Sequence, residues 1–117
     1  MPQRAPLRSS AEYRTVYGKG RRYDGRLVSV FVLANGMAQH RLGITASRKM
    51  SLKAVGRNRA KRLIRETFRL SRAELDALQS RYDWVINARR SLLSVKIPLV
   101  LEEFRRIVAQ VKSDEVR

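Results

Sequence analysis

The residues with the clearest chemical potential form a basic run in the middle of the chain, broken by a single acid, Glu66. The run contains these cations and one amide: Arg57, Asn58, Arg59, Lys61, Arg62, Arg65 and Arg69. Arg57, Lys61 and Arg65 are four residues apart, which places them along one edge of a helix. Like charges at this spacing disfavour an isolated helix, whereas guanidinium groups on successive turns suit successive phosphates. We predict that these residues bind a nucleic-acid backbone; the alternative is a solvated basic face without a partner.

Three aromatic residues outside this run are candidates for contact with bases. Tyr13 and Tyr17 lie one helical turn apart, and Phe31 lies in a β-branched segment. Aromatic rings beside cations stack on unpaired bases, and each stack is worth roughly 1–3 kcal/mol. The alternative is that the rings are ordinary core residues, because sequence spacing alone does not place all three on one surface.

No group of residues is arranged for catalysis or for metal binding. His40 is the only histidine and has no acidic neighbour in the sequence, so it forms neither a catalytic triad nor a metal cluster. The acidic residues are scattered, without a pair suited to two-metal nuclease chemistry and without a glycine-rich phosphate loop nearby. We therefore expect no catalytic residue and no metal ligand, and we interpret His40 and the single tryptophan, Trp84, as structural.

The chain as a whole is strongly basic. Its 117 residues include 26 Lys and Arg against 10 Asp and Glu, a formal charge of +16, and most of the excess lies in residues 1–70. This imbalance favours a nucleic-acid partner. No segment approaches the ~20 apolar residues of a membrane span, the N-terminus lacks the apolar run of a signal peptide, and there is no cysteine. We expect a cytoplasmic protein that does not bind membranes.

The elements that position these residues are predicted from hydrophobic spacing and turn signals. We expect residues 1–9 to form a flexible basic arm and residues 113–117 to form a frayed tail. Between these two ends the chain is predicted to form, in order, a helix over 11–17 capped by Ser10, strands over 19–23, 27–33 and 40–47, a helix from 55 toward 78 with a break near Ser71, a strand over 82–88, and a helix over 97–111.

This α-β-β-β-α-β-α order predicts an α+β two-layer sandwich, with helices packed on a mixed central sheet in one domain over residues 1–117. The strand over 40–47 is expected to run antiparallel to the strand over 27–33. The apolar arc of the central helix would face the sheet; it comprises Ala60, Leu63, Ile64, Thr67, Phe68 and Leu70. Strands 40–47 and 82–88, joined by this helix, form a β-α-β unit, which is right-handed in about 98% of proteins.

The central helix also contains a longer motif. Residues 54–69, AVGRNRAKRLIRETFR, closely resemble the signature of the protein subunit of bacterial ribonuclease P. Three further segments resemble the family's first helix with its glycine turn and two of its strands: residues 13–20, 42–49 and 82–89. The resemblance extends over about residues 8–110.

The resemblance implies a partner and an activity. Proteins of this family bind one large catalytic RNA, which removes the 5′ leader from precursor tRNA with Mg²⁺ held by the RNA, and no obligate protein partner is expected. The holoenzyme is an endonuclease. By position, the residues implied to contact the catalytic RNA are Arg57, Asn58, Arg59, Lys61, Arg62 and Arg65. Those implied to form the leader-binding cleft are Tyr13, Tyr17 and Phe31. The family also implies a left-handed β-α-β crossover, against the general rule.

Other functions remain open at this level. A ribosomal or other structural RNA-binding protein would show the same basic surface but would not distinguish precursor from mature tRNA. A protein-only nuclease is disfavoured by the spacing of the acidic residues. A DNA-binding helix-turn-helix is disfavoured because predicted strands flank the basic helix.

Overall fold

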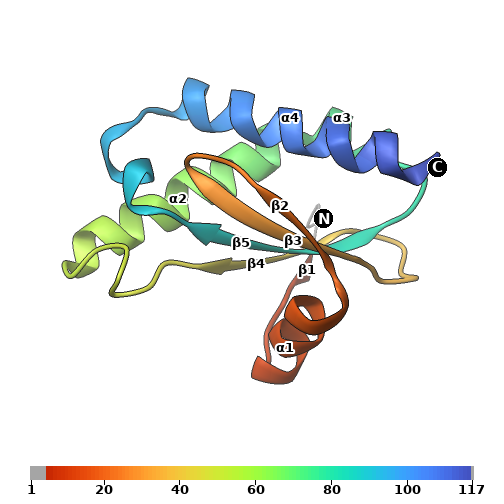
Figure 1. Cartoon of the computed structure of the whole chain (residues 1–117), viewed down its shortest axis with the longest axis horizontal. Coiled ribbons are helices and arrows are strands. Elements are labelled where there is room, and N and C mark those ends of the chain that lie inside the picture. The colour runs from red at the N-terminus through yellow and green to blue at the C-terminus, as the bar shows by residue number, and fades with distance from the viewer. Residues whose placement is uncertain (1–4, 117) are drawn as a thin grey trace.

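The computed structural model describes residues 5–116, which form a mixed sheet with helices on both faces (Figure 1). The strands are β1 (Ala5–Pro6), β2 (Arg21–Asp24), β3 (Val28–Ala34), β4 (Arg41–Thr45) and β5 (Tyr82–Ala88). The helices are α1 (Ser10–Lys19), α2 (Ala54–Leu70), α3 (Arg72–Asp76), the 3-10 helix η1 (Arg90–Ser94) and α4 (Ile97–Glu115). The predicted α+β order is confirmed; α3 is the part of the predicted central helix beyond the break at Ser71, and β1 and η1 are short additions.

The sheet has the strand order β1-β4-β5-β3-β2, so the last strand in the sequence is the middle strand in space. β5 pairs antiparallel with β3 and parallel with β4. β4 therefore runs opposite to β3, as predicted, but β5 lies between the two. The helices α2, α3 and α4 lie on one face of the sheet, and α1 lies on the other (Figure 1).

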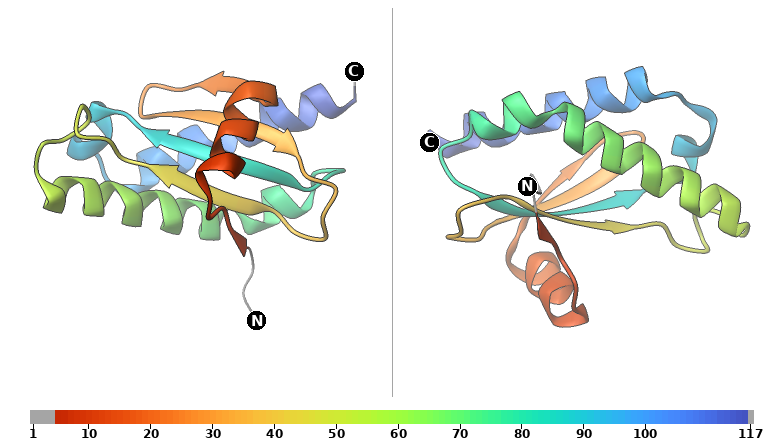
Figure 2. Two further views of the ribbon diagram at one scale, coloured as in Figure 1. Left: turned by 90° about the horizontal axis from the view of Figure 1, so that it is seen from below. Right: turned by 180° about the vertical axis from the view of Figure 1, so that it is seen from behind.

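The connection from β4 through α2 to β5 is a left-handed crossover. β4 and β5 are parallel neighbours. Viewed from the α1 side (Figure 2, left), both strands run toward the same end of the sheet and α2 passes behind it. If this view is turned so that both strands point upward, β5 lies to the right of β4. A connection that passes behind the sheet and leads to the strand on the right is left-handed. The sense implied by the family resemblance is confirmed, and the general right-handed preference is not followed here.

Strand β3 is covered on both faces, which explains its nearly continuous apolar sequence. Val28, Val30 and Val32 are buried in the main core beneath α2 and α4. Phe31 and Leu33 point the other way and pack in a smaller cluster beneath α1. Alternate side chains of this strand therefore belong to different cores.

The centre of the main core is aromatic and contains one histidine. Trp84 is fully buried, with its ring centroid 6.1 Å from that of Phe68. Nδ1 of the buried His40 accepts hydrogen bonds from Trp84 Nε1 and from the Tyr82 backbone N–H, each at 3.0 Å. Nε2 donates to the carbonyl of Leu75 at 3.1 Å, so this neutral tautomer satisfies all three partners. The predicted structural roles of His40 and Trp84 are confirmed.

The predicted flexible arm over residues 1–9 is wrong from Ala5 onward, and residues 1–4 lie outside the described part of the chain. Strand β1 pairs with the first residues of β4, although its sequence contains a proline. Leu7 is buried, and its N–H donates to the Leu42 carbonyl at 3.0 Å. A proline is tolerated because the strand is short and lies at the edge of the sheet.

Helix α1 is longer than predicted and begins one residue earlier. Ser9, and not Ser10, is the N-cap: its hydroxyl accepts from the Glu12 N–H at 3.1 Å. The Glu12 carboxylate in turn accepts from the Ser9 N–H at 3.0 Å, completing a capping box. The helix continues through Gly18 and ends at Lys19, with Gly20 as its C-cap.

The predicted fraying over residues 113–117 is also wrong for the part of this segment that belongs to α4. Acidic side chains anchor this end of the helix to the sheet. Asp114 accepts a hydrogen bond from the Tyr23 hydroxyl at 2.6 Å. Glu115 accepts one from the Tyr82 hydroxyl at 2.5 Å. The two tyrosines belong to β2 and β5, so α4 is held at its end by two strands.

Candidate nucleic-acid interface

Helix α2 carries the predicted basic run and packs on the sheet through a narrow apolar side. Its buried residues are Ala60, Ile64, Thr67 and Phe68. Leu63 is half-buried and packs beside them. Leu70 is 37% exposed, so the prediction that it belongs to the apolar arc is wrong. The difference arises at the helix end, where the chain turns at Ser71 and α3 begins, as the predicted break indicated.

The start of α2 lacks a side-chain cap. The helix begins at Ala54, one residue before the prediction, and its N-cap is Lys53. The nearby Ser51 hydroxyl donates a hydrogen bond to the Lys53 carbonyl and does not accept one from a helix N–H. The first turn is instead tied back by Arg57, whose Nη1 donates to the carbonyls of Ser51 at 2.9 Å and Leu52 at 3.0 Å. This arginine therefore shapes the loop before α2 as well as presenting charge.

Arg59 points toward η1 and the residue that follows it. Its guanidinium donates to the carbonyls of Leu92, Leu93 and Val95, at 3.5, 3.2 and 2.8 Å. Three acceptors hold the planar group in one orientation. Arg59 therefore braces α2 against η1 and the residue that follows it, a structural role that the sequence did not reveal.

Arg69 is also occupied, by the acid that interrupts the basic run. Its guanidinium forms a bidentate ion pair with Glu66, one turn earlier on α2, with Nε 2.9 Å from Oε1. Both side chains are substantially exposed, so this pair contributes little to stability. It does reduce the net positive charge at this end of the helix.

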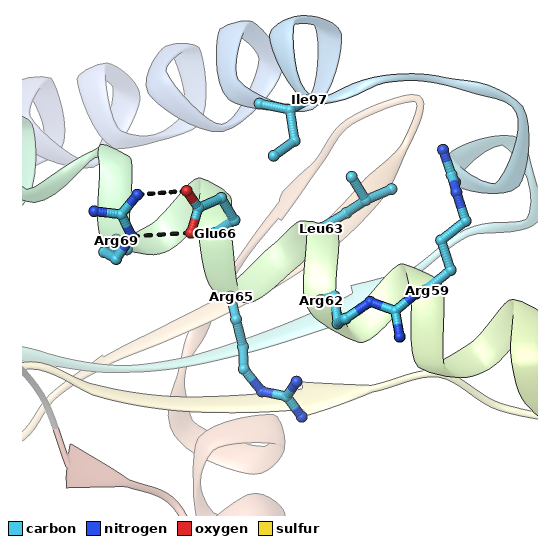
Figure 3. Close-up of a pocket in the computed structure, with 7 residues that line it drawn as sticks. All are labelled: Arg59, Arg62, Leu63, Arg65, Glu66, Arg69 and Ile97. Atoms are coloured by element: carbon cyan, nitrogen blue, oxygen red, sulfur yellow. Dashed lines mark hydrogen bonds and ion pairs between the residues drawn. The ribbon is translucent and has the colours of Figure 1, made fainter.

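The remaining cations of the run have no partner in the part of the chain that the structure describes. They are Lys61, Arg62 and Arg65, and the neighbouring amide of Asn58 is exposed as well. Figure 3 shows Arg65 extending from α2 away from α4, and Arg62 running along the helix toward Arg59. The structure thus divides the predicted basic residues into three that bind the protein itself and three that are available to a ligand.

The predicted aromatic residues meet on the opposite face of the sheet. Tyr17 and Phe31 pack edge to face, with ring centroids 4.8 Å apart at an angle of 83°. The guanidinium carbon of Arg22, on β2, lies 5.4 Å from the Phe31 centroid. Tyr13 packs in the same cluster, one turn before Tyr17 on α1. We refer to Tyr13, Tyr17 and Phe31 together as the aromatic surface.

Residues that the sequence analysis missed complete this surface. The Asn87 side-chain oxygen accepts hydrogen bonds from the hydroxyls of Tyr17, at 2.8 Å, and Thr45. Gly43 lies directly beneath Tyr13: a Cβ at this glycine would lie 2.7 Å from the tyrosine Oη. A glycine inside a strand is a signal of close approach, and this position could have been found in that way.

A network of ion pairs fixes α1 against the sheet. Arg41 on β4 binds Asp83 on β5 at 2.6 Å and Glu12 on α1 at 2.7 Å. The backbone N–H groups of Ser9 and Arg8, followed by Arg41, lower the pKa of Glu12 to about 2. The start of α1 is thereby held at a defined position over β4 and β5, with the aromatic surface beside it.

A shallow pocket lies between α2 and the start of α4 (Figure 3). Its volume is about 400 Å³. It is lined by Arg59, Arg62, Leu63, Arg65, Glu66, Arg69 and Ile97. We refer to it as the arginine pocket.

Among residues 5–116, no three His, Cys, Asp or Glu side chains gather as potential metal ligands. None of the helices in the described chain is long and apolar enough to cross a membrane. The acidic side chains near the aromatic surface, Glu12 and Asp83, are both bound to Arg41.

Comparison with known proteins gives a consistent set of matches. Residues 1–112 match the family model described as Ribonuclease P. A Ribonuclease P protein component from Methylococcus capsulatus is 37% identical over 105 residues, which cover 90% of this chain and 79% of the relative. The solved RNase P protein from Thermotoga maritima has a TM-score of 0.79 at 28% identity, covering 92% of this chain and 97% of that one. For the Staphylococcus aureus RNase P protein the TM-score is 0.76 at 26% identity, with coverages of 92% and 94%.

Proposed function

The chain belongs to the ribonuclease P protein family, and on that premise we propose that it is the RNA-binding subunit of a bacterial ribonuclease P. In this role it binds one catalytic RNA in the cytoplasm and assists removal of the 5′ leader from precursor tRNA. The RNA binds the Mg²⁺ ions and performs the phosphodiester hydrolysis. The protein contributes affinity and position, and no side chain of this chain takes part in bond cleavage.

One observation carries this proposal: helix α2, which bears the available cations, and the aromatic surface lie on opposite faces of one sheet. A protein that contacts two RNA segments at once needs two such surfaces. We assign the catalytic RNA to α2, where Lys61, Arg62 and Arg65 are unpartnered in the described chain. We assign the leader to the aromatic surface beneath α1.

The chemistry of the two surfaces suits these two ligands. Cations on successive helical turns neutralise phosphates of a folded RNA regardless of its sequence. Leader sequences vary, and stacking on a ring is tolerant of base identity because every base has a π-face. Arg22, which lies over Phe31, places a cation beside the stacked bases and close to their phosphates.

Reconstitution with ribonuclease P RNA tests the proposal. We expect the chain to permit cleavage of precursor tRNA at a Mg²⁺ concentration at which the RNA alone is inactive. We also expect tighter binding of precursor than of mature tRNA by the reconstituted complex. An RNA activity that is unchanged by the protein would refute the proposal. Equal binding of both tRNAs, with co-sedimentation on ribosomal subunits, would instead favour a structural RNA-binding protein.

A further inference from the structure

The arginine pocket differs from the rest of the basic helix because two of its four guanidinium groups are already fixed. At one end, the guanidinium of Arg59 is held by three backbone carbonyls. At the other end, the guanidinium of Arg69 is held by Glu66. Figure 3 shows these two groups at opposite ends of the pocket. Their separation of ten positions in the sequence corresponds to roughly 15 Å along the helix axis.

The floor between the two ends is apolar. Leu63 on α2 and Ile97 at the start of α4 point toward one another across the pocket (Figure 3). Both side chains are only partly buried, so each leaves apolar surface open to solvent. Apolar surface in the middle of a strongly cationic region is not needed for binding phosphates.

We propose that the arginine pocket binds one unstacked nucleobase of the catalytic RNA, with Leu63 and Ile97 beneath the base and a fixed guanidinium plane beside it. Arg62, at the rim, contacts a phosphate next to that nucleotide. The proposal rests on the proposed function, because it names how α2 recognises the same RNA partner.

Three features favour a base over the other parts of an RNA. A base offers a flat apolar face that matches the Leu63 and Ile97 side chains. Guanidinium planes stack on bases, and planes that are already held in place lose little conformational entropy when they do so. The Glu66 carboxylate, which also lines the pocket, already pairs with Arg69, so this guanidinium is less available to a phosphate seated inside. The phosphates are therefore expected at the rim.

The size of the pocket is consistent with one nucleotide. A volume of about 400 Å³ lies in the lower part of the ~300–1,000 Å³ range of small-ligand sites. A base and its ribose fit such a space, whereas an intact duplex does not enter it. The RNA segment at this site is therefore a loop, bulge or junction whose base is turned outward.

Matched lysine substitutions on α4 provide the test. Ile97→Lys removes apolar floor and adds a positive charge, whereas Leu99→Lys adds the same charge two residues away, at a 54% exposed position outside the pocket. If a base occupies the floor, Ile97→Lys weakens binding of ribonuclease P RNA roughly tenfold in spite of its extra charge, given the size of a stacking contact. Leu99→Lys retains or increases the affinity. Equal or tighter binding by both variants would overturn the proposal.

A second measurement does not depend on the holoenzyme or on the stability of a variant. The full chain is titrated with adenosine 5′-monophosphate and, separately, with inorganic phosphate, while the NMR signals of the Leu63 and Ile97 methyl groups are followed. A base above the floor shifts these methyl signals through its ring current, and inorganic phosphate does not. Identical responses to both probes would mean that phosphate alone binds at this place and would refute the base pocket. If the reconstitution experiment fails, the proposed function is refuted. The result of this titration does not depend on that outcome, so the two failures can be told apart.

Discussion

The Tyr17 hydroxyl donates a 2.8 Å hydrogen bond to the side-chain oxygen of Asn87, 70 residues later in the sequence. This bond joins the exposed side of α1 to the central strand β5. It also fixes the orientation of the Tyr17 ring, which is 38% exposed and packs edge-on against Phe31. The aromatic surface is therefore positioned before any ligand arrives.

Replacement of Tyr17 tests whether this ring contacts the leader. We expect Tyr17→Ala to weaken precursor tRNA binding by the reconstituted complex roughly tenfold, because a stacked base contributes about 1–3 kcal/mol. Mature tRNA lacks the leader, so its affinity stays unchanged. Tyr17→Phe keeps the ring, loses the bond to Asn87 and has a smaller effect. The same loss for both tRNAs in Tyr17→Ala would indicate a folding role.

The available and the occupied cations of α2 are expected to differ in their salt dependence. Lys61→Ala and Arg65→Ala each remove one phosphate contact, which lowers the slope of log affinity against log salt by ~0.7–0.9. Arg69→Ala removes a cation that Glu66 already neutralises, so its slope changes less. The measurement is RNA binding at a series of salt concentrations. A larger change of slope for Arg69→Ala than for Arg65→Ala would contradict this division.

Arg59 is expected to affect stability before it affects RNA binding. Arg59→Ala leaves the carbonyls of Leu92, Leu93 and Val95 without their donor. Loss of hydrogen bonds to a charged group costs about 1–3 kcal/mol in the free energy of unfolding, toward the lower value at a half-buried site. Lysine cannot span three acceptors, so Arg59→Lys recovers only part of the loss. Urea unfolding of the protein without RNA measures both variants, and a wild-type midpoint for Arg59→Ala would refute the bracing role.

The buried His40 is expected to make the fold sensitive to mild acid. Burial lowers the pKa of His40 from its ordinary value of 6.5. Because the folded-state pKa is the lower one, the stabilisation from the neutral ring is complete above pH 6.5 and is lost as the pH falls through the folded-state pKa. Protonation also places a hydrogen on Nδ1, opposite two N–H donors.

The matching measurement is the free energy of unfolding as a function of pH. In the wild type it declines below pH 6.5, above the range in which the contribution of Glu12 is lost, which extends from its ordinary pKa of 4.5 down to about 2. His40→Gln is less stable at pH 7 and lacks the decline in the upper part of this range. A decline of equal size in both proteins would assign it to other groups.

Gly43 allows a test that leaves every aromatic residue in place. In Gly43→Ala the new methyl group would lie 2.7 Å from the Tyr13 Oη, so the ring must move away from β4. The contact involves the far end of a side chain, and we expect weaker leader binding with little loss of stability. The measurements are the affinities for precursor and mature tRNA and a thermal unfolding curve of the variant. Unchanged precursor affinity would mean that the Tyr13 position is not used.

Periodicity and turn signals were sufficient for the main elements of this fold. The alternation of β3 and the break at Ser71 both follow from local residue types, and both are observed. The order of the strands does not follow from local signals. It depends on β5 pairing with β3 and β4 at once, and the left-handed crossover came from family resemblance, against the general preference.

The site was predicted in composition but not in detail. The helix pattern identified the basic residues, but it did not reveal that Arg59 binds carbonyls 33 to 36 residues away. Glu103 illustrates the same limit: it was one of several scattered acids, yet its carboxylate accepts three backbone N–H groups of the segment that leads into β3. Contacts of this kind depend on tertiary packing, and no local pattern encodes them.

The central position of β5 has a consequence for synthesis of the chain. β5 pairs with both β3 and β4. Until the ribosome has synthesised Tyr82–Ala88, the nascent chain therefore contains β3 and β4 without the strand that joins them. The β2–β3 hairpin can form during translation, but the parallel half of the sheet has to wait. Folding on the ribosome is therefore completed late, and until then α2 is exposed as a cationic segment without its apolar support.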